Sequence, residues 1–306
     1  MVKLLSIGIN GAVDEIREKL VQGCGSLVEE GFSIAFEEMK RGGYTFLSCN
    51  VSEGELSFRN YERIKNLLKD DASRILANWI VEHEELNIVN KIIEQNYHYF
   101  NPDERQSVRK NTLATLHSAN SCDNLGFSAA ARHKLILNRI MEYLDNHHEL
   151  VMEGFVNFRL KDYHQKLSLT VDRVVDDFMM ELEYKEFIRV LRYFVDVQEP
   201  RVEEAHVIIS GNGNFKILDQ NSNAISNQYL DNLVLKSQST ADINEISQED
   251  LLISALITIA PHSIIIHSSS HARDQDILET VKNVFDGRVI LCKGCEMCKV
   301  ESLTKR

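Results

Sequence analysis

The sequence predicts an α+β protein: an N-terminal βαββ unit, then a large central helical bundle, then a C-terminal mixed sheet ending in an α-β-α-β arrangement. Apolar residues recur every third or fourth position in the middle of the chain, but in short runs or at alternate positions near both ends. These two periods are typical of helices and strands respectively. Only 3 prolines and 14 glycines occur among 306 residues, which favours long uninterrupted helices.

The βαββ unit is expected over residues 1–56. The pattern predicts a strand over Val2–Ile7, a helix over Ala12–Glu29, and two more strands over Phe32–Met39 and Tyr44–Val51. The last two strands flank a Gly42-Gly43 pair, and paired glycines suit the positive φ of a hairpin turn. The sequence therefore predicts a β-hairpin after the first helix.

The helical region is expected over residues 57–199. From Asn60 the apolar spacing predicts either one very long helix or a broken pair. Asn101, followed by Pro102 and two acids, is typical of a helix N-terminus, and Ser128 is expected to cap the next helix. A further helical stretch is predicted from about Glu149 to Val197, where Pro200 ends it.

The C-terminal region is expected over residues 200–306. Two short apolar runs separated by Asn-Gly residues predict a hairpin or meander, and the rest of the region alternates helix, strand, helix and strand. This order implies that the last two strands pair in parallel. The predicted elements are strands at Ala205–Ile209 and Phe215–Leu218, a helix at Gln248–Ile259, a strand at Ser263–His267, a helix at Asp274–Phe285 and a strand at Arg288–Leu291.

Composition and charge narrow the class of protein. Acidic residues outnumber basic ones 46 to 34, giving a net charge of -12, which opposes binding to nucleic acid. No apolar run reaches the roughly 18 residues needed to cross a membrane, and the N-terminus lacks the pattern of a signal peptide. The 6 cysteines do not resemble a secreted disulfide framework. We therefore expect a cytoplasmic protein without a membrane span.

A run of three cysteines near the C-terminus carries the strongest chemical pattern. Cys292, Cys295 and Cys298 form a C-x2-C-x2-C motif directly after the last predicted strand. This spacing lets a tight turn direct thiolates at one ion, and Gly294 supplies the backbone freedom that such a turn requires. The motif favours a zinc site or an iron–sulfur cluster, but a tetrahedral site needs a fourth ligand.

Histidines near the preceding strand could complete the site. His267 ends that strand and His271 follows it closely. If the last two strands are parallel neighbours, their C-terminal ends lie at the same edge of the sheet, which brings either imidazole toward the cysteines. A zinc site of three cysteines and one histidine is then allowed. A redox dithiol and three unliganded reduced thiols are the remaining interpretations.

Other motifs that would indicate an enzyme are absent from the sequence. Gly8 and Gly11 follow the first strand without a third glycine or a P-loop lysine, and Ser210-Gly211 lacks the flanking pattern of a nucleophile elbow. An Asn-Gly turn explains the latter composition. The sequence favours a non-enzymatic protein, with an enzyme site assembled from distant loops as the alternative.

The segments of the C-terminal half that carry a family resemblance are Glu183–Ile188, Tyr193–Pro200, Leu251–Thr258 with Ala260-Pro261, and Phe285–Val289 leading to the cysteine run. Over roughly the last 130 residues the chain resembles the sporulation protein YtxC family of endospore-forming bacteria. The resemblance implies a role connected with sporulation and a cytoplasmic setting, and it implies no catalytic residues. We therefore expect a protein-binding factor, and the cysteine spacing alone leaves open whether a structural metal closes its C-terminal layer. A redox-active or iron–sulfur protein that uses the cysteine run is the alternative.

Overall fold

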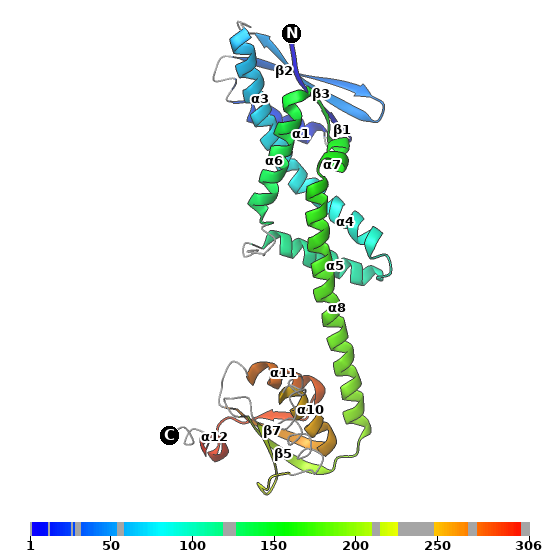
Figure 1. Cartoon of the computed structure of the whole chain (residues 1–306), viewed down its shortest axis with the longest axis vertical. Helices are drawn as coiled ribbons and strands as arrows, with labels where there is room; N and C mark the ends of the chain where they lie inside the picture. Colours follow the sequence, from blue (N-terminus) through cyan, green and yellow to red (C-terminus); the bar gives the residue numbers. More distant parts are fainter. Residues whose placement is uncertain are drawn as a thin grey trace, which may run out of the picture. The chain divides into compact units, whose positions relative to one another are not determined.

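A computed structural model describes residues 2–11, 13–25, 27, 32–53, 58–118, 127–209, 215–225, 248–268 and 274–300. The chain forms two compact units, Met1–Met179 and Met180–Arg306, called the N-terminal unit and the C-terminal unit below. Each unit has a four-stranded sheet and its own hydrophobic core. Figure 1 shows the helices and strands of both units. The predicted α+β class is confirmed, whereas the division of the chain at residues 56 and 199 stays a prediction.

The sheet of the N-terminal unit has the strand order β2-β3-β1-β4. Strand β1 leads through helix α1 into an antiparallel β2–β3 hairpin, and β3 returns antiparallel to β1, which confirms the predicted βαββ unit. Gly42 takes φ +60° at the hairpin turn, where a side chain would be strained. The bounds are β1 Val2–Ile9, α1 Val13–Gly23, β2 Ser33–Arg41 and β3 Tyr44–Glu53.

The fourth strand of this sheet corrects the sequence-based assignment of a helix from about Glu149. The three residues of β4, Glu149–Val151, pair in parallel with Ser6–Gly8 of β1. The Ser6 N–H also donates to the carbonyl oxygen of His148, at 2.9 Å. Because β4 satisfies backbone groups along one edge of β1, pairing with a distant strand prevails over the local helical pattern.

Helices make up most of the remaining N-terminal unit, as predicted. The long helical run after the hairpin is continuous but contains one π-helical turn, η1, in which the Glu85 N–H bonds the Ile80 carbonyl. Asn101 and Ser128 cap α5 and α6 as predicted. The bounds are α3 Phe58–Trp79, η1 Ile80–Glu84, α4 Glu85–Asn96, α5 Pro102–His117, α6 Ala129–Asn146, α7 Met152–Arg159 and α8 Lys161–Val197, whose last 18 residues belong to the C-terminal unit.

A buried ion pair joins three of these helices. The guanidinium of Arg132 on α6 lies 2.8 Å from the carboxylate of Glu85 on α4, and both side chains are almost fully buried. Tyr163 of α8 donates its hydroxyl to the same carboxylate. Arg132 also donates to the carbonyl oxygens of Leu116 and Phe127, at 2.9 and 3.3 Å. The charges are thus paired and hydrogen-bonded, as burial requires.

The sheet of the C-terminal unit has the order β6-β5-β7-β8. The β5–β6 pair is antiparallel, while β5–β7 and β7–β8 are parallel, which confirms the predicted pairing of the last two strands. The bounds are β5 Val202–Ile209, β6 Phe215–Asp219, α10 Gln248–Ile259, β7 Pro261–Ser268, α11 Asp274–Val284, β8 Val289–Leu291 and α12 Glu296–Val300.

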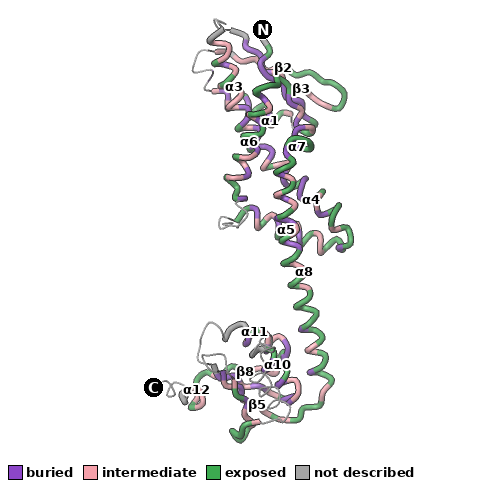
Figure 2. Tube along the Cα trace, viewed as in Figure 1, coloured by how far each residue is buried: buried purple, intermediate pink, exposed green. Residues whose placement is uncertain are grey.

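The two faces of this sheet differ in burial. Helix α10 leads from β6 into β7, helix α11 connects the parallel strands β7 and β8, and both helices lie on one side of the sheet (Figure 1). The strand residues facing the core are buried, among them Val207 and Ile266, and Figure 2 colours such positions purple. Side chains alternate along a strand, so His206, Ile265 and His267 share the opposite face. The cysteine run lies beside this second face.

Candidate metal centre

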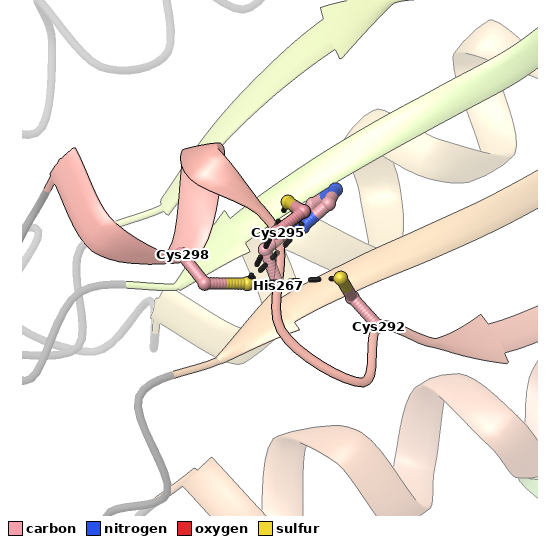
Figure 3. Close-up of side chains that lie close together, drawn as sticks. All are labelled: His267, Cys292, Cys295 and Cys298. Atoms are coloured by element: carbon pink, nitrogen blue, oxygen red, sulfur yellow. Dashed lines mark hydrogen bonds between the residues drawn. The ribbon is translucent and has the colours of Figure 1, made fainter.

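The candidate site is built where β7 and β8 end. Ile266 pairs with Leu291 in the parallel register of these strands, so His267 and Cys292 are the next residues along the two neighbouring strands. The Cys292 N–H donates to the Ile266 carbonyl oxygen at 2.9 Å, which continues the ladder by one bond. After a short loop, α12 begins at Glu296 and brings Cys298 back toward His267 (Figure 3).

Four ligand atoms converge in this way. Those of His267, Cys292, Cys295 and Cys298 all lie within 4.8 Å of one another. The Nδ1 atom of His267 lies 3.3 Å from the sulfur of Cys295 and 3.5 Å from that of Cys298. The Cys298 sulfur lies 3.9 Å from that of Cys295 and 3.7 Å from that of Cys292 (Figure 3).

These separations are those of ligands around one ion. Sulfur at about 2.3 Å and nitrogen at about 2.0–2.1 Å from a tetrahedral zinc ion give edges of about 3.8 Å between sulfurs and about 3.6 Å between sulfur and nitrogen. In a [4Fe–4S] cluster each protein ligand binds a different iron atom, so the sulfurs must lie further apart than around a single ion. The cluster could therefore hold one metal ion.

The loop conformation depends on one glycine. Gly294 takes φ +115°, a value that side chains other than hydrogen rarely allow. Its N–H donates to the sulfur of Cys292 at 3.4 Å. The turn thus directs a backbone donor at a thiolate and positions the next cysteine of the motif, as the sequence pattern predicts.

The electrostatic environment differs among the ligands. Hydrogen bonding from the backbone of Cys298 lowers the pKa of the Cys295 thiol, which favours the thiolate that metals bind. Burial raises the pKa of Cys298. Burial lowers the pKa of His267, and the nearby His206 lowers it further by a smaller amount. This favours the neutral imidazole, the form that can donate a lone pair to a metal ion.

The structure describes four of the five predicted ligands, His267, Cys292, Cys295 and Cys298. His271 lies outside the described residues, so the structure does not test its place in the site. His206 was missed from the sequence: its Nδ1 atom lies 3.1 Å from the Nε2 of His267, and its own Nε2 lies 2.9 Å from a carboxylate oxygen of Glu204. Only the register between β5 and β7 brings these residues to His267, and local spacing does not contain that register.

A second group of potential metal ligands, also within 4.8 Å of one another, lies in the N-terminal unit. It consists of Glu15, Glu82 and His83. The ammonium group of Lys19 lies 3.0 Å from the carboxylate of Glu15 and 2.8 Å from that of Glu82. A lysine therefore already supplies the positive charge between these carboxylates, and we assign no metal to them.

The N-terminal unit contains a cavity of about 390 Å³ beside the end of β1. Asn10, Glu84, Asn90, Lys91 and Glu153 contribute polar groups to its lining. No hydroxyl, thiol or imidazole side chain belongs to the lining among the described residues, so it offers no nucleophile–histidine pair of the kind used in acyl transfer.

None of the described helices is long and apolar enough to cross a membrane.

Comparisons with known proteins identify the family. The model of the YtxC-like family matches residues 70–290, a range that includes His267 and ends before Cys292. The chain is 25% identical over 219 residues to the uncharacterized protein YtxC of Bacillus subtilis (strain 168), which covers 70% of this chain and 74% of that protein. No solved structure is significantly similar. Because the family model matches more than half of the chain, this protein belongs to the YtxC-like family.

Proposed function

We propose that the C-terminal unit is stabilised by one structural zinc ion, bound through His267, Cys292, Cys295 and Cys298. The separations of the four ligand atoms carry this proposal. Three thiolates and one imidazole are donors that suit zinc, and structural zinc sites are four-coordinate with protein ligands only. Bound there, the ion would fasten the loop after β8 and helix α12 to the end of β7, and its binding energy would add to the stability of the unit.

For the whole protein, we propose a role as a cytoplasmic sporulation factor that binds another protein and is not an enzyme. The family resemblance supports a role in sporulation, and the net charge of -12 favours a protein partner over nucleic acid. Further support comes from an apolar face of α8 in the C-terminal unit. Phe187, Val190, Phe194 and Val197 are exposed there at steps of three, four and three, the spacing of a helix-binding stripe.

Metal analysis with visible spectroscopy on anaerobically purified protein tests the zinc centre. We expect about one equivalent of zinc and no visible colour in the wild type, with the metal lost in Cys295→Ser. Cys24→Ala, which removes a buried thiol from the N-terminal unit, is the control and should keep the metal. A brown protein containing iron would establish the iron–sulfur alternative, and a metal-free wild type would overturn both.

Two observations favour the alternative of a redox dithiol. The sulfurs of Cys295 and Cys298 lie 3.9 Å apart, and the pKa of Cys295 is lowered while that of Cys298 is raised. A reactive thiolate next to a second thiol is typical of exchangeable disulfides. Peptide mass mapping after equilibration with glutathione would detect a Cys295–Cys298 disulfide. We expect it only after zinc is removed, since bound thiolates are protected.

Crosslinking in sporulating cells tests the wider role. Phe187→Glu combined with Phe194→Glu should abolish a crosslink to a partner protein that forms with the wild type. Leu169→Glu, an exposed apolar position of α8 in the N-terminal unit, should leave that crosslink intact. Deletion of the gene should lower the yield of spores. An unchanged spore yield, or a crosslink that survives the double substitution, would contradict this role.

A further inference from the structure

A chain of three polar side chains leads from the surface of the C-terminal unit to the candidate metal centre. Glu204 and His206 lie on β5, and His206 faces His267 of β7 on the side of the sheet away from α10 and α11. The planes of the two imidazole rings differ by 28°, and their centroids lie 5.3 Å apart. The side chain of His206 is only 13% exposed, so its polar atoms depend on protein partners.

When both imidazoles are neutral, the hydrogen bonds of this chain fix the position of every proton. An ionised carboxylate only accepts, so the Nε2 of His206, 2.9 Å from Glu204, must carry a proton. In a neutral imidazole the other nitrogen is then an acceptor. The Nδ1 of His206 therefore accepts from the Nε2–H of His267 across 3.1 Å.

This arrangement of protons determines the state of the Nδ1 atom of His267. With its proton on Nε2, neutral His267 has a free lone pair on Nδ1. That atom faces the sulfurs of Cys295 and Cys298, at 3.3 and 3.5 Å. The reverse arrangement would place an unprotonated nitrogen of His206 against the carboxylate of Glu204, two acceptors without a proton between them. With both imidazoles neutral, only this direction of the chain satisfies every group.

We infer that Glu204 and His206 are positioning residues of the metal centre, which hold His267 in the one tautomer and ring orientation that can bind the ion through Nδ1. This inference rests on the proposed zinc site and extends it to a second strand, β5. A metal-bound histidine usually donates the N–H of its other ring nitrogen to a nearby acceptor. Such an acceptor orients the imidazole and raises its basicity. Removal of such an acceptor typically lowers metal affinity by about 10–100-fold.

Competition of the full-length protein with a chelator for Zn²⁺ tests the inference. His206→Phe keeps a planar ring but removes the acceptor, and we expect a loss of affinity of about 10–100-fold. His206→Asn returns an oxygen near the place of Nδ1 and should recover most of the loss. Glu204→Gln should give a smaller loss, because the amide can present an oxygen or an NH₂ group. His262→Gln, an exposed imidazole on the same strand as His267, is the control.

Nitrogen chemical shifts of His267 in the zinc-loaded protein separate positioning from simple stability. The wild type and His206→Asn should show a protonated Nε2 and a metal-bound Nδ1, whereas His206→Phe should lose this single tautomer. Equal affinities and an unchanged tautomer in His206→Phe would overturn the inference while leaving the zinc site intact. A wild type that binds no zinc would overturn both, and the two failures are therefore distinguishable.

Discussion

Replacing Arg132 by methionine should destabilise the N-terminal unit strongly. The substitution keeps much of the aliphatic volume but leaves the carboxylate of Glu85, 2% exposed, without a positive partner. Removing one member of a buried ion pair costs about 3–5 kcal/mol. With a urea dependence of about 2 kcal/mol per molar, a loss of about 4 kcal/mol lowers the unfolding midpoint by about 2 M.

The fluorescence of Trp79 is the assay for this change. It is the single tryptophan of the chain and is buried in the N-terminal core, so its signal follows that unit alone. Arg74→Met is the matched control, because the pair of Arg74 with Asp70 is a solvent-exposed i,i+4 pair. Such pairs contribute only about 0.3–0.5 kcal/mol, so the midpoint should move little.

A double variant separates the unpaired charge from the lost contacts. Glu85→Gln combined with Arg132→Met removes the buried charge, while the amide oxygen introduced at position 85 can still accept from the Tyr163 hydroxyl. We expect the double variant to be more stable than Arg132→Met alone. If Arg132→Met unfolds at the same midpoint as the control, the reasoning about burial is wrong. If the double variant is as unstable as the single one, the loss comes from the carbonyl groups that Arg132 serves.

Three further predictions concern a helix cap, two buried thiols and the turn of the cysteine motif. Asn101→Ala removes the capping box of α5 and should lower the free energy of unfolding by about 1 kcal/mol, measured by the same urea titration. Burial raises the pKa of Cys24 to about 12 and raises that of Cys49 as well. Both thiols should therefore resist alkylation at pH 8.5 in the folded protein and react in urea. Because the folded-state pKa values are raised, this contribution to stability is present below about pH 8.5 and is lost as the pH rises toward 12, which urea titrations across that range would detect. Gly294→Ala forces a side chain into φ +115° at a cost of about 1–3 kcal/mol. It should lower zinc affinity by at least about fivefold in a chelator competition, and an unchanged affinity would mean that the loop relaxes without strain.

Much of the fold could be predicted from local patterns, because such patterns depend only on residues close together in the sequence. The caps at Asn101 and Ser128 start helices where the sequence places them, since each side chain bonds a backbone N–H three residues on. The helix–strand alternation after residue 247 predicted a parallel β7–β8 pair, since a helical crossover forces that direction. Both features depend only on spacing along the chain.

Features that depend on distant partners were not predicted. The three residues of β4 form a strand only because β1, more than 130 residues earlier, offers an unpaired edge. Glu85 directly follows the π-turn η1 and is buried in the core, where Arg132 balances its charge. Neither the partner strand nor the partner charge lies within a local window. The position of His206 beside His267 likewise requires the register of β5 against β7.

The register of β8 connects the candidate metal centre to the fold. This edge strand has only three residues, and Ile290 and Leu291 remain largely exposed, so burial alone specifies its register weakly. A slip by one residue would turn Cys292 to the other face of the sheet, away from His267. An ion bound by both residues would be incompatible with that slip. A metal ion bound by the cysteines would thus supply the register specificity that the apolar side chains of this short strand do not.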